Sequence, residues 1–327
     1  MKRILAAWVM LLLLFPGRGW AEADLEPAAT AGNEPDMQVV LVTGVHSGPA
    51  LWRVWSGNHT LWLLGEISPY PRKIKWRSKE FDRRLQQSQE LLIDFSGYWW
   101  ADADNEAALD QASRLPEGTK LKDVIAPELY ARVEATAAKF GNPSLEPWRP
   151  FSATNRLVSA AMKTLDLEGF SVRFSATKSG QWRGKKITYF SAPEIPFEER
   201  LLHWQSPENE VCLRRLVDTI GDGGKGLLHL ANAWAVGDIQ SLRELVPRYS
   251  FSRDGFRAGE CADAMHGGVQ EAIDYKTRRT QAWLAEAKRA LEKNRSTMAV
   301  VLMSELFEPD GYLAALRAEG FEIVEPK

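Results

Sequence analysis

The sequence has little cysteine and histidine and no excess of charge of either sign. Its 327 residues include 2 Cys and 5 His, and no histidine stands in a His-Glu-x-x-His motif or another tight ligand spacing. Two cysteines cannot staple a disulfide-dependent mini-protein. Lys and Arg number 41 against 43 Asp and Glu. We interpret the basic residues as spread along the chain rather than bunched, so no nucleic-acid partner is expected.

A long apolar run is missing after the N-terminal residues. Lys2 and Arg3 precede the apolar run 4–15, whose 12 residues fall short of the roughly 20 that a membrane-spanning helix needs. With small residues up to Ala21, this pattern is typical of a secretory signal peptide over residues 1–21. We therefore expect a periplasmic or secreted protein with no membrane span after cleavage of the signal.

The two cysteines are interpreted as a pair because export is expected. Cys212 and Cys261 are 49 positions apart, and in an oxidising compartment an isolated pair is more often bridged than free. The sequence therefore predicts a disulfide between them, with two separate buried thiols as the alternative.

What the chain does have is 45% hydrophobic residues, in strand-like runs near both ends and helical patterns between them. Residues 22–48 are predicted to be a partly flexible lead-in and residues 49–327 a single domain. Apolar, aromatic runs at 51–55 and 60–65 flank a Gly-Asn turn, which predicts a β-hairpin, and 91–95 is typical of a buried strand. The predicted class is α/β (α+β), with a mixed sheet built from N- and C-terminal strands and a helical insertion in the middle. Further elements are expected as helices at 78–89, 127–140, 152–165, 196–220, 227–236, 239–245, 270–294 and 310–319, and as strands at 187–189, 298–303 and 321–324.

Candidate site residues follow predicted strands, because ligands of α/β sheets bind beyond the carboxyl ends of strands. Two loops qualify, 65–68 with Glu66 and 303–306 with Glu305; each acid is equally interpretable as a solvated loop carboxylate. Asp94 ends a very apolar run, so its ionised side chain needs a partner. The paired arginines at 278 and 279 are candidates for that partner.

Three parts of the chain resemble the TraB/GumN family, which is related to the Tiki-type metalloproteases. The opening hairpin is similar to that of the family, Ala233–Asp238 resembles its Trp-x-x-Gly-Asp segment, and Pro309–Leu313 with Gly320-Phe321 resembles its closing strand, helix and strand. The similarity runs from about residue 50 to residue 324. It implies a divalent-metal hydrolase built around two Gly-x-x-His motifs with nearby acids and an arginine.

The sequence departs from the family pattern at the ligand positions. The first Gly-x-x-His motif ends in Ser68, and the second has lost its glycine and ends in Glu305. Asp94 stands where the family tends to have a glutamate, and a second family glutamate is replaced by Phe190. The resemblance implies that the family arginine is retained as Arg278 or Arg279.

Two hypotheses follow from these departures. A serine hydroxyl is a poor metal ligand and a phenyl ring is none, which favours a pseudoenzyme with no cofactor and a binding or scaffold role. The alternative is an active peptidase-like hydrolase that uses the degenerate positions Glu66, Ser68, Asp94, Arg278 and Glu305. In that case Glu66, Asp94 and Glu305 form an all-oxygen site for Mn, Mg or Ca.

Two further motifs bear on partners. Tyr98-Trp99-Trp100 follows the Asp94 strand on an apparent loop, and exposed rings there would suit a peptide, protein or glycan partner. Gly221–Gly226 contains Gly-x-Gly-x-x-Gly, but a predicted helix precedes it where dinucleotide-binding proteins have a strand. A connector between helices is therefore favoured over nucleotide binding, and no pattern in the sequence predicts an oligomeric state.

Overall fold

The computed structural model describes residues 48–74, 76–95, 103–169, 171–191, 196–250 and 260–326. The chain divides into Met1–Gln38 and Val39–Lys327, and every described residue lies in the second unit. The predicted signal peptide, nearly all of the lead-in and the Tyr98-Trp99-Trp100 segment lie outside the described residues. Within the described ranges, no helix is long and apolar enough to cross a membrane.

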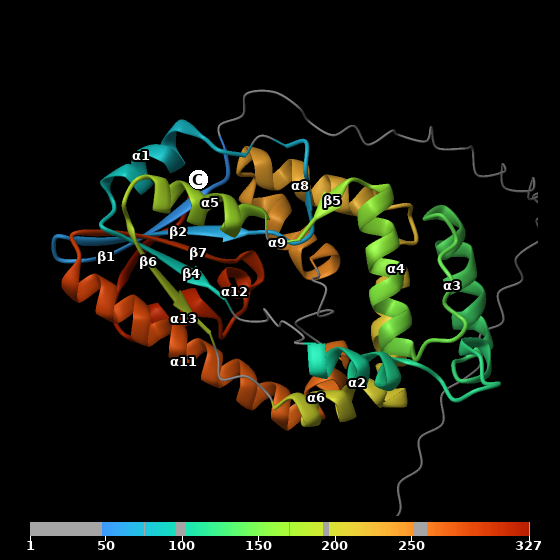
Figure 1. The fold of residues 1–327 in the computed structure, drawn as a ribbon. Coiled ribbons are helices and arrows are strands. Elements are labelled where there is room, and N and C mark those ends of the chain that lie inside the picture. Colours follow the sequence, from blue (N-terminus) through green and yellow to red (C-terminus); the bar gives the residue numbers. More distant parts are fainter. Residues whose placement is uncertain are drawn as a thin grey trace, which may run out of the picture. The chain divides into compact units, whose positions relative to one another are not determined.

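A six-stranded mixed sheet is the central layer of this unit (Figure 1), with strand order β6-β4-β7-β2-β1-β8. The first two strands form the predicted antiparallel hairpin, and β2, β7, β4 and β6 run parallel. β8 pairs antiparallel with β1, so N- and C-terminal strands build one sheet and the predicted fold class is confirmed. The strands are β1 (Leu51–Ser56), β2 (His59–Glu66), β4 (Glu90–Asp94), β6 (Lys186–Phe190), β7 (Ser296–Leu302) and β8 (Glu322–Val324).

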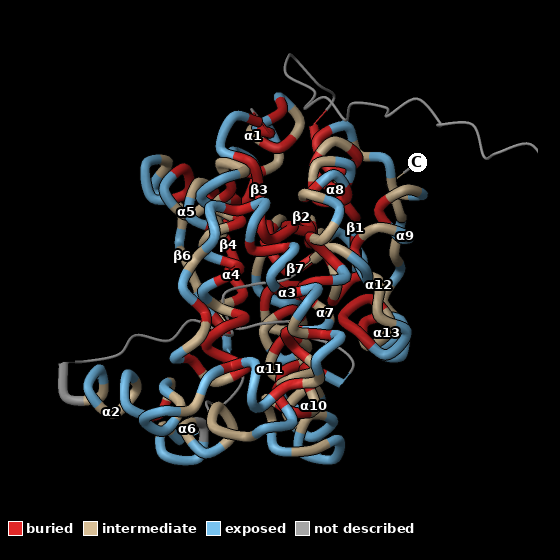
Figure 2. Tube along the Cα trace, turned by 90° about the vertical axis from the view of Figure 1, so that its right-hand side faces the viewer, coloured by how far each residue is buried: buried red, intermediate tan, exposed pale blue. Residues whose placement is uncertain are grey.

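Central strands are apolar because they are covered on both faces. Every residue of β4 is buried, and so are six of the seven residues of β7. Figure 2 shows the buried segments gathered inside, with exposed helix faces around them. Helices α1 (Lys79–Gln87) and α5 (Ser171–Trp182) cover one face of the sheet, and α11 (Val269–Lys293) and α13 (Tyr312–Ala318) cover the other (Figure 1). Such coverage is typical of parallel strands.

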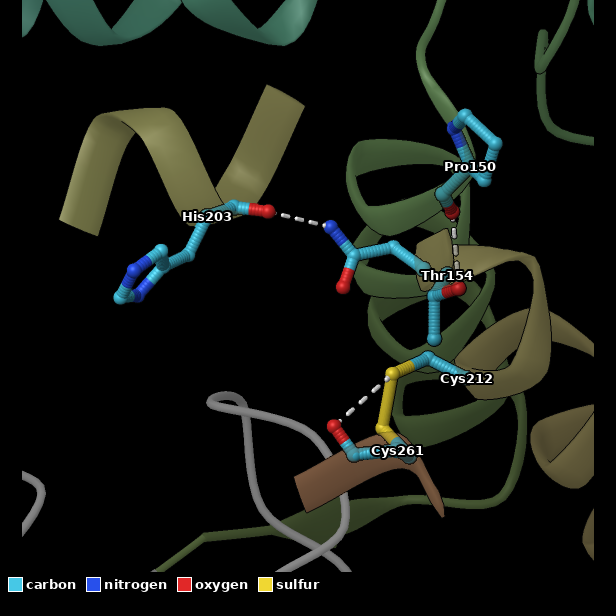
Figure 3. Close-up of a disulfide and its surroundings, with 6 residues drawn as sticks. Pro150, Thr154, His203, Cys212 and Cys261 are labelled. Carbon is cyan, nitrogen blue, oxygen red and sulfur yellow. Dashed lines mark hydrogen bonds between the residues drawn. A yellow bond between two sulfur atoms is a disulfide. The ribbon is translucent and has the colours of Figure 1, made fainter. Parts of the chain in front are cut away.

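The helical insertion has a core of its own. It is built mainly on the buried faces of α3, α4 and α7, and the predicted disulfide between Cys212 and Cys261 joins α7 to α10, with an S–S distance of 2.04 Å (Figure 3). The disulfide prediction is confirmed. The remaining elements are α2 (Ala103–Ser113), α3 (Pro127–Lys139), α4 (Pro150–Thr164), α6 (Phe197–Gln205), α7 (Glu210–Ile220), α8 (Lys225–Val236), α9 (Ile239–Tyr249), α10 (Glu260–His266), α12 (Met303–Phe307), the 3-10 turns Leu121–Asp123 and Pro207–Asn209, and the small sheet of β3 (Tyr70–Pro71) and β5 (Leu167–Glu168).

Two local predictions are wrong, and two helices were not predicted. The single helix predicted at 196–220 is broken after α6, because Pro207 has no amide hydrogen to continue the helix and the Ser206 hydroxyl caps a new turn at the Glu208 amide, 3.2 Å away. The segment 303–306 is the first turn of helix α12 rather than a loop. Helices α2 and α5 were not predicted, since the Ser, Thr and Gly of α5 are weak helix formers.

Candidate functional site

Three acidic side chains meet where neighbouring parallel strands end. Glu66 is the last residue of β2, Asp94 is the last residue of β4, and Glu305 lies in the helical turn that directly follows β7. β7 lies between β2 and β4, so the carboxyl ends of all three strands share one edge of the sheet. The acids are buried, with 1%, 0% and 6% of their surface exposed, respectively. The alternative that Glu66 and Glu305 are solvated loop carboxylates is therefore wrong.

Arg279 joins two of these acids from helix α11. Its Nη1 donates to Oε1 of Glu305 at 2.5 Å, and its Nη2 donates to Oδ2 of Asp94 at 2.6 Å. The Tyr312 hydroxyl donates to the same Asp94 oxygen at 3.2 Å. Arg279 is only 4% exposed, whereas Arg278 is exposed. Of the two candidate arginines, the structure therefore brings Arg279 to the acids, and Arg278 lies outside the cluster.

Arg173 holds the third acid from helix α5 on the opposite face of the sheet. Its backbone amide donates to Oε2 of Glu66 at 3.0 Å, and its guanidinium donates to Oε1 of Glu66 and to the backbone carbonyl of Asp94. Only 1% of Arg173 is exposed. Sequence analysis missed this residue. The sequence did offer one signal. Arg173 is a single cation beside Val172 on an apolar helix face, and the buried acids required a second cationic partner.

The charges of the cluster are nearly balanced. Two guanidiniums, which stay protonated in proteins, face three carboxylates, so the cluster carries a net charge of −1 when all the acids are ionised. Burial raises the pKa of Glu66, and Arg173 opposes this effect only in part. Burial also raises the pKa of Tyr312 well above its ordinary value, so this side chain remains a neutral donor to Asp94.

Some buried polar atoms of the site have no hydrogen-bond partner among the described residues. They are Oε2 of Glu305, Nε of Arg279 and Oγ of Ser68. Ser68 is 2% exposed, and its backbone carbonyl accepts a hydrogen bond from the Ser250 hydroxyl at 3.3 Å. The Ser68 hydroxyl therefore contributes no hydrogen bond to the acidic cluster.

The glycine of the first motif is explained by packing. A Cβ atom on Gly65 would lie 2.7 Å from Sδ of Met303, because α12 rests directly on the end of β2. The indole of Trp234, in the Ala233–Asp238 segment, donates to the Gly65 carbonyl at 2.6 Å. Gly65 and Trp234 therefore fix the backbone at the end of β2.

The predicted metal ligands are arranged around guanidiniums rather than around a common point. Within the described parts of the chain, no three His, Cys, Asp or Glu side chains are placed to share one metal ion. A cation between Asp94 and Glu305 would have to displace Arg279, which binds both acids and repels a second positive charge. Phe190 packs against Trp283, with ring centroids 5.3 Å apart, and supplies no donor. As arranged, Asp94 and Glu305 each accept a hydrogen bond from the Arg279 guanidinium.

Glu90 shows how differently a buried acid behaves at the other end of β4. Two nitrogens of Arg289 donate to it at 2.7 and 3.1 Å, and Asn294 and Lys186 bind it at 2.7 and 2.9 Å. Burial alone would raise its pKa, but these bonds and one from Thr188 together lower the pKa to about 2. Glu90 lies at the amino end of the strand, at the opposite end from Asp94 and the candidate site.

The glycine-rich segment Gly221–Gly226 connects helices α7 and α8, as predicted. The Asp222 carboxylate accepts hydrogen bonds from the amides of Gly224 and Gly226 at 2.8 and 2.9 Å. It thus occupies donors that a phosphate would need at the start of α8. A Cβ atom on Gly226 would lie 2.0 Å from the ring of Tyr249, so close packing explains that glycine.

Comparison with known proteins gives one match. The model of the TraB/PrgY/gumN family matches residues 50–325, a range that includes every residue of the acidic cluster and both arginines. Searches of curated proteins and of solved structures return no match.

Proposed function

The chain belongs to the TraB/PrgY/gumN family, and we propose that it is an exported, non-catalytic member of that family. In this proposal the inherited hydrolase site has become a buried ion-pair core, and the protein acts as a binding or scaffold protein. The observation that carries the proposal is the position of Arg279 between Asp94 and Glu305.

The replacement of histidine by Glu305 supplies the physical reason. A neutral imidazole at that position could bind a metal while a nearby arginine kept a single acidic partner. A glutamate instead gives Arg279 a second anionic partner at 2.5 Å. The guanidinium then has a carboxylate on each side, so both acids are engaged where a metal ion would need them free. Ser68 and Phe190 remove two further ligand positions.

Export is supported by the sequence pattern of residues 1–21 and by the disulfide between Cys212 and Cys261. Structural disulfides persist mainly in oxidising compartments, so the bridge agrees with a periplasmic or secreted protein.

One observation favours the competing hypothesis of a metal-dependent hydrolase. Oε2 of Glu305 has no hydrogen-bond partner among the described residues, and the cluster carries one more acid than base. Movement of Arg279 would leave Asp94 and Glu305 with free oxygens that suit a hard cation such as Mn or Mg.

Metal analysis of the full chain, purified without chelators, distinguishes the two hypotheses. We expect no stoichiometric metal, and no change in melting temperature on adding millimolar Mn, Mg or Ca. A metal ion that binds the site, present at a concentration 100 times its Kd, would stabilise the folded state by about 2.7 kcal/mol. Thermal melting detects a change of that size readily. One metal ion per chain that is lost in Glu305→Gln, a variant of nearly the same shape, would contradict the non-catalytic proposal.

A further inference from the structure

A basic surface lies on one face of the sheet, where α1 and α5 are neighbours (Figure 1). Nη2 of Arg183 donates to Asp82 of α1 at 3.1 Å, and Nζ of Lys185 donates to the Gln86 carbonyl at 2.7 Å. We call residues 77–89 and 174–185 the basic face.

The basic face has a charge opposite to that of the remaining chain. It holds seven Lys and Arg against two Asp and Glu, a net charge of +5, whereas the whole chain carries −2. All other residues together therefore carry −7. The basic residues are spread along the sequence, but the fold groups seven of them on this face. Folding brings two basic segments, about 90 positions apart in sequence, onto the same side of the sheet.

Aromatic rings project from the same face. Phe174, Lys178 and Trp182 are spaced four residues apart, so they form one exposed stripe along α5. Trp182 is 84% exposed and Phe174 is 46% exposed. The Arg183 guanidinium lies 5.5 Å from the centre of the Trp182 ring, which places a cation beside the most exposed aromatic side chain of the described residues. On the adjacent edge strand β6, Tyr189 is 50% exposed.

We propose that the basic face docks onto an anionic phospholipid surface. Lysines near such a surface are attracted by the headgroup charge, and Trp is enriched at the level of the headgroups because its ring is both apolar and polar. Lys79 on α1 and Lys178 on α5 are both exposed, and Trp182 can insert between headgroups while the lysines contact phosphates. The contact is peripheral and uses a folded surface.

The choice of lipid rests on the export part of the proposed function. Cations with exposed rings also suit single-stranded nucleic acid, but an exported chain meets membrane phospholipid outside the cytoplasm. The proposal is independent of the metal question, because neither Lys79, Lys178 nor Trp182 contacts the acidic cluster in the described structure. A bound metal would therefore leave the lipid proposal intact, and absence of vesicle binding would leave the non-catalytic proposal intact.

Co-sedimentation of the full chain with vesicles tests the proposal. We expect binding to phosphatidylglycerol-containing vesicles and little binding to pure phosphatidylcholine vesicles. Raising the salt concentration should weaken the binding, since exposed charges are screened. Because each lysine near an anionic surface contributes about fivefold, Lys79→Glu with Lys178→Glu should weaken binding by at least about 25-fold. Trp182→Ala should weaken it roughly tenfold.

Matched controls come from the parts of the molecule outside the basic face. Leu202→Ser removes a 69% exposed apolar side chain from α6, and Lys293→Glu reverses an exposed lysine of α11. Both should leave vesicle binding unchanged, and far-UV circular dichroism should show that all variants fold. Equal binding to neutral vesicles, or equal losses in the control variants, would overturn the proposal. So would binding to a single-stranded oligonucleotide in the absence of any vesicle binding.

Discussion

Replacing Arg279 by methionine tests whether the acidic cluster is a structural ion-pair core. Methionine keeps an unbranched apolar side chain in the space that Arg279 occupies but removes the charge. Asp94 and Glu305, which are 0% and 6% exposed, then lose the guanidinium that binds both of them. Tyr312 still donates to the Asp94 carboxylate, and Arg173 still binds Glu66.

The expected decrease in the free energy of unfolding depends on how the folded variant accommodates the two acids. Removing one partner of a buried ion pair typically costs about 3–5 kcal/mol. Each stranded acid can instead take up a proton, and holding a carboxyl of ordinary pKa near 4 protonated at pH 7 costs about 4 kcal/mol. Two stranded acids set an upper limit of about 8 kcal/mol. We therefore expect Arg279→Met to lower the free energy of unfolding at pH 7 by about 4–6 kcal/mol, given the remaining bond from Tyr312.

The pH dependence separates a charge effect from a packing effect. Stranded acids favour the protonated form in the folded variant, so the folded state binds more protons than the unfolded state above pH 4. The decrease in the free energy of unfolding should therefore be about 1 kcal/mol near pH 4 and should grow as the pH rises to 7. Urea denaturation at both pH values measures it, and Arg278→Met is the control because Arg278 is exposed. A loss equal to that of the control, or one independent of pH, would refute the ion-pair interpretation.

Three further outcomes follow, two from the structure and one from the sequence of residues 1–21. Because the pKa of Glu90 is lowered from 4.5 to about 2, its contribution is present above pH 4.5 and lost toward pH 2. Glu90→Gln should therefore reduce the change in melting temperature between pH 4.5 and pH 2, and should lower the free energy of unfolding at pH 7 by about 3 kcal/mol. Replacing Cys212 and Cys261 by alanine should cost about 4 kcal/mol by chain entropy, measured by urea denaturation; an unchanged midpoint would contradict this. Intact mass of the protein from the exporting host should match cleavage after Ala21, and an uncleaved chain would contradict export.

Much of the fold could be predicted because local signals agree with it. The Gly-Asn turn between two aromatic runs predicts the hairpin of β1 and β2, and the apolar run before Asp94 predicts β4. Proline at the first position of α3 indicates where that helix begins. The break before Pro207 was missed, because the apolar pattern continues through it while the backbone cannot.

The candidate site could be predicted only in part. Positions that follow strands place Glu66, Asp94 and Glu305 at one edge, because parallel strands end together. The partners of these acids come from helices far along the chain, and nothing local distinguishes Arg279 from Arg278. Only the rotation of α11 about its axis, fixed by packing on the sheet, turns one arginine inward and the other to solvent.

A crystal structure of the full chain grown with Mn tests most directly whether guanidiniums have taken the place of a metal. Anomalous diffraction locates Mn without ambiguity. We expect the Arg279 guanidinium between Asp94 and Glu305, and no anomalous peak at the three carboxylates. A Mn ion bound by Glu66, Asp94 or Glu305, with Arg279 displaced from them, would contradict the proposal that this site is non-catalytic.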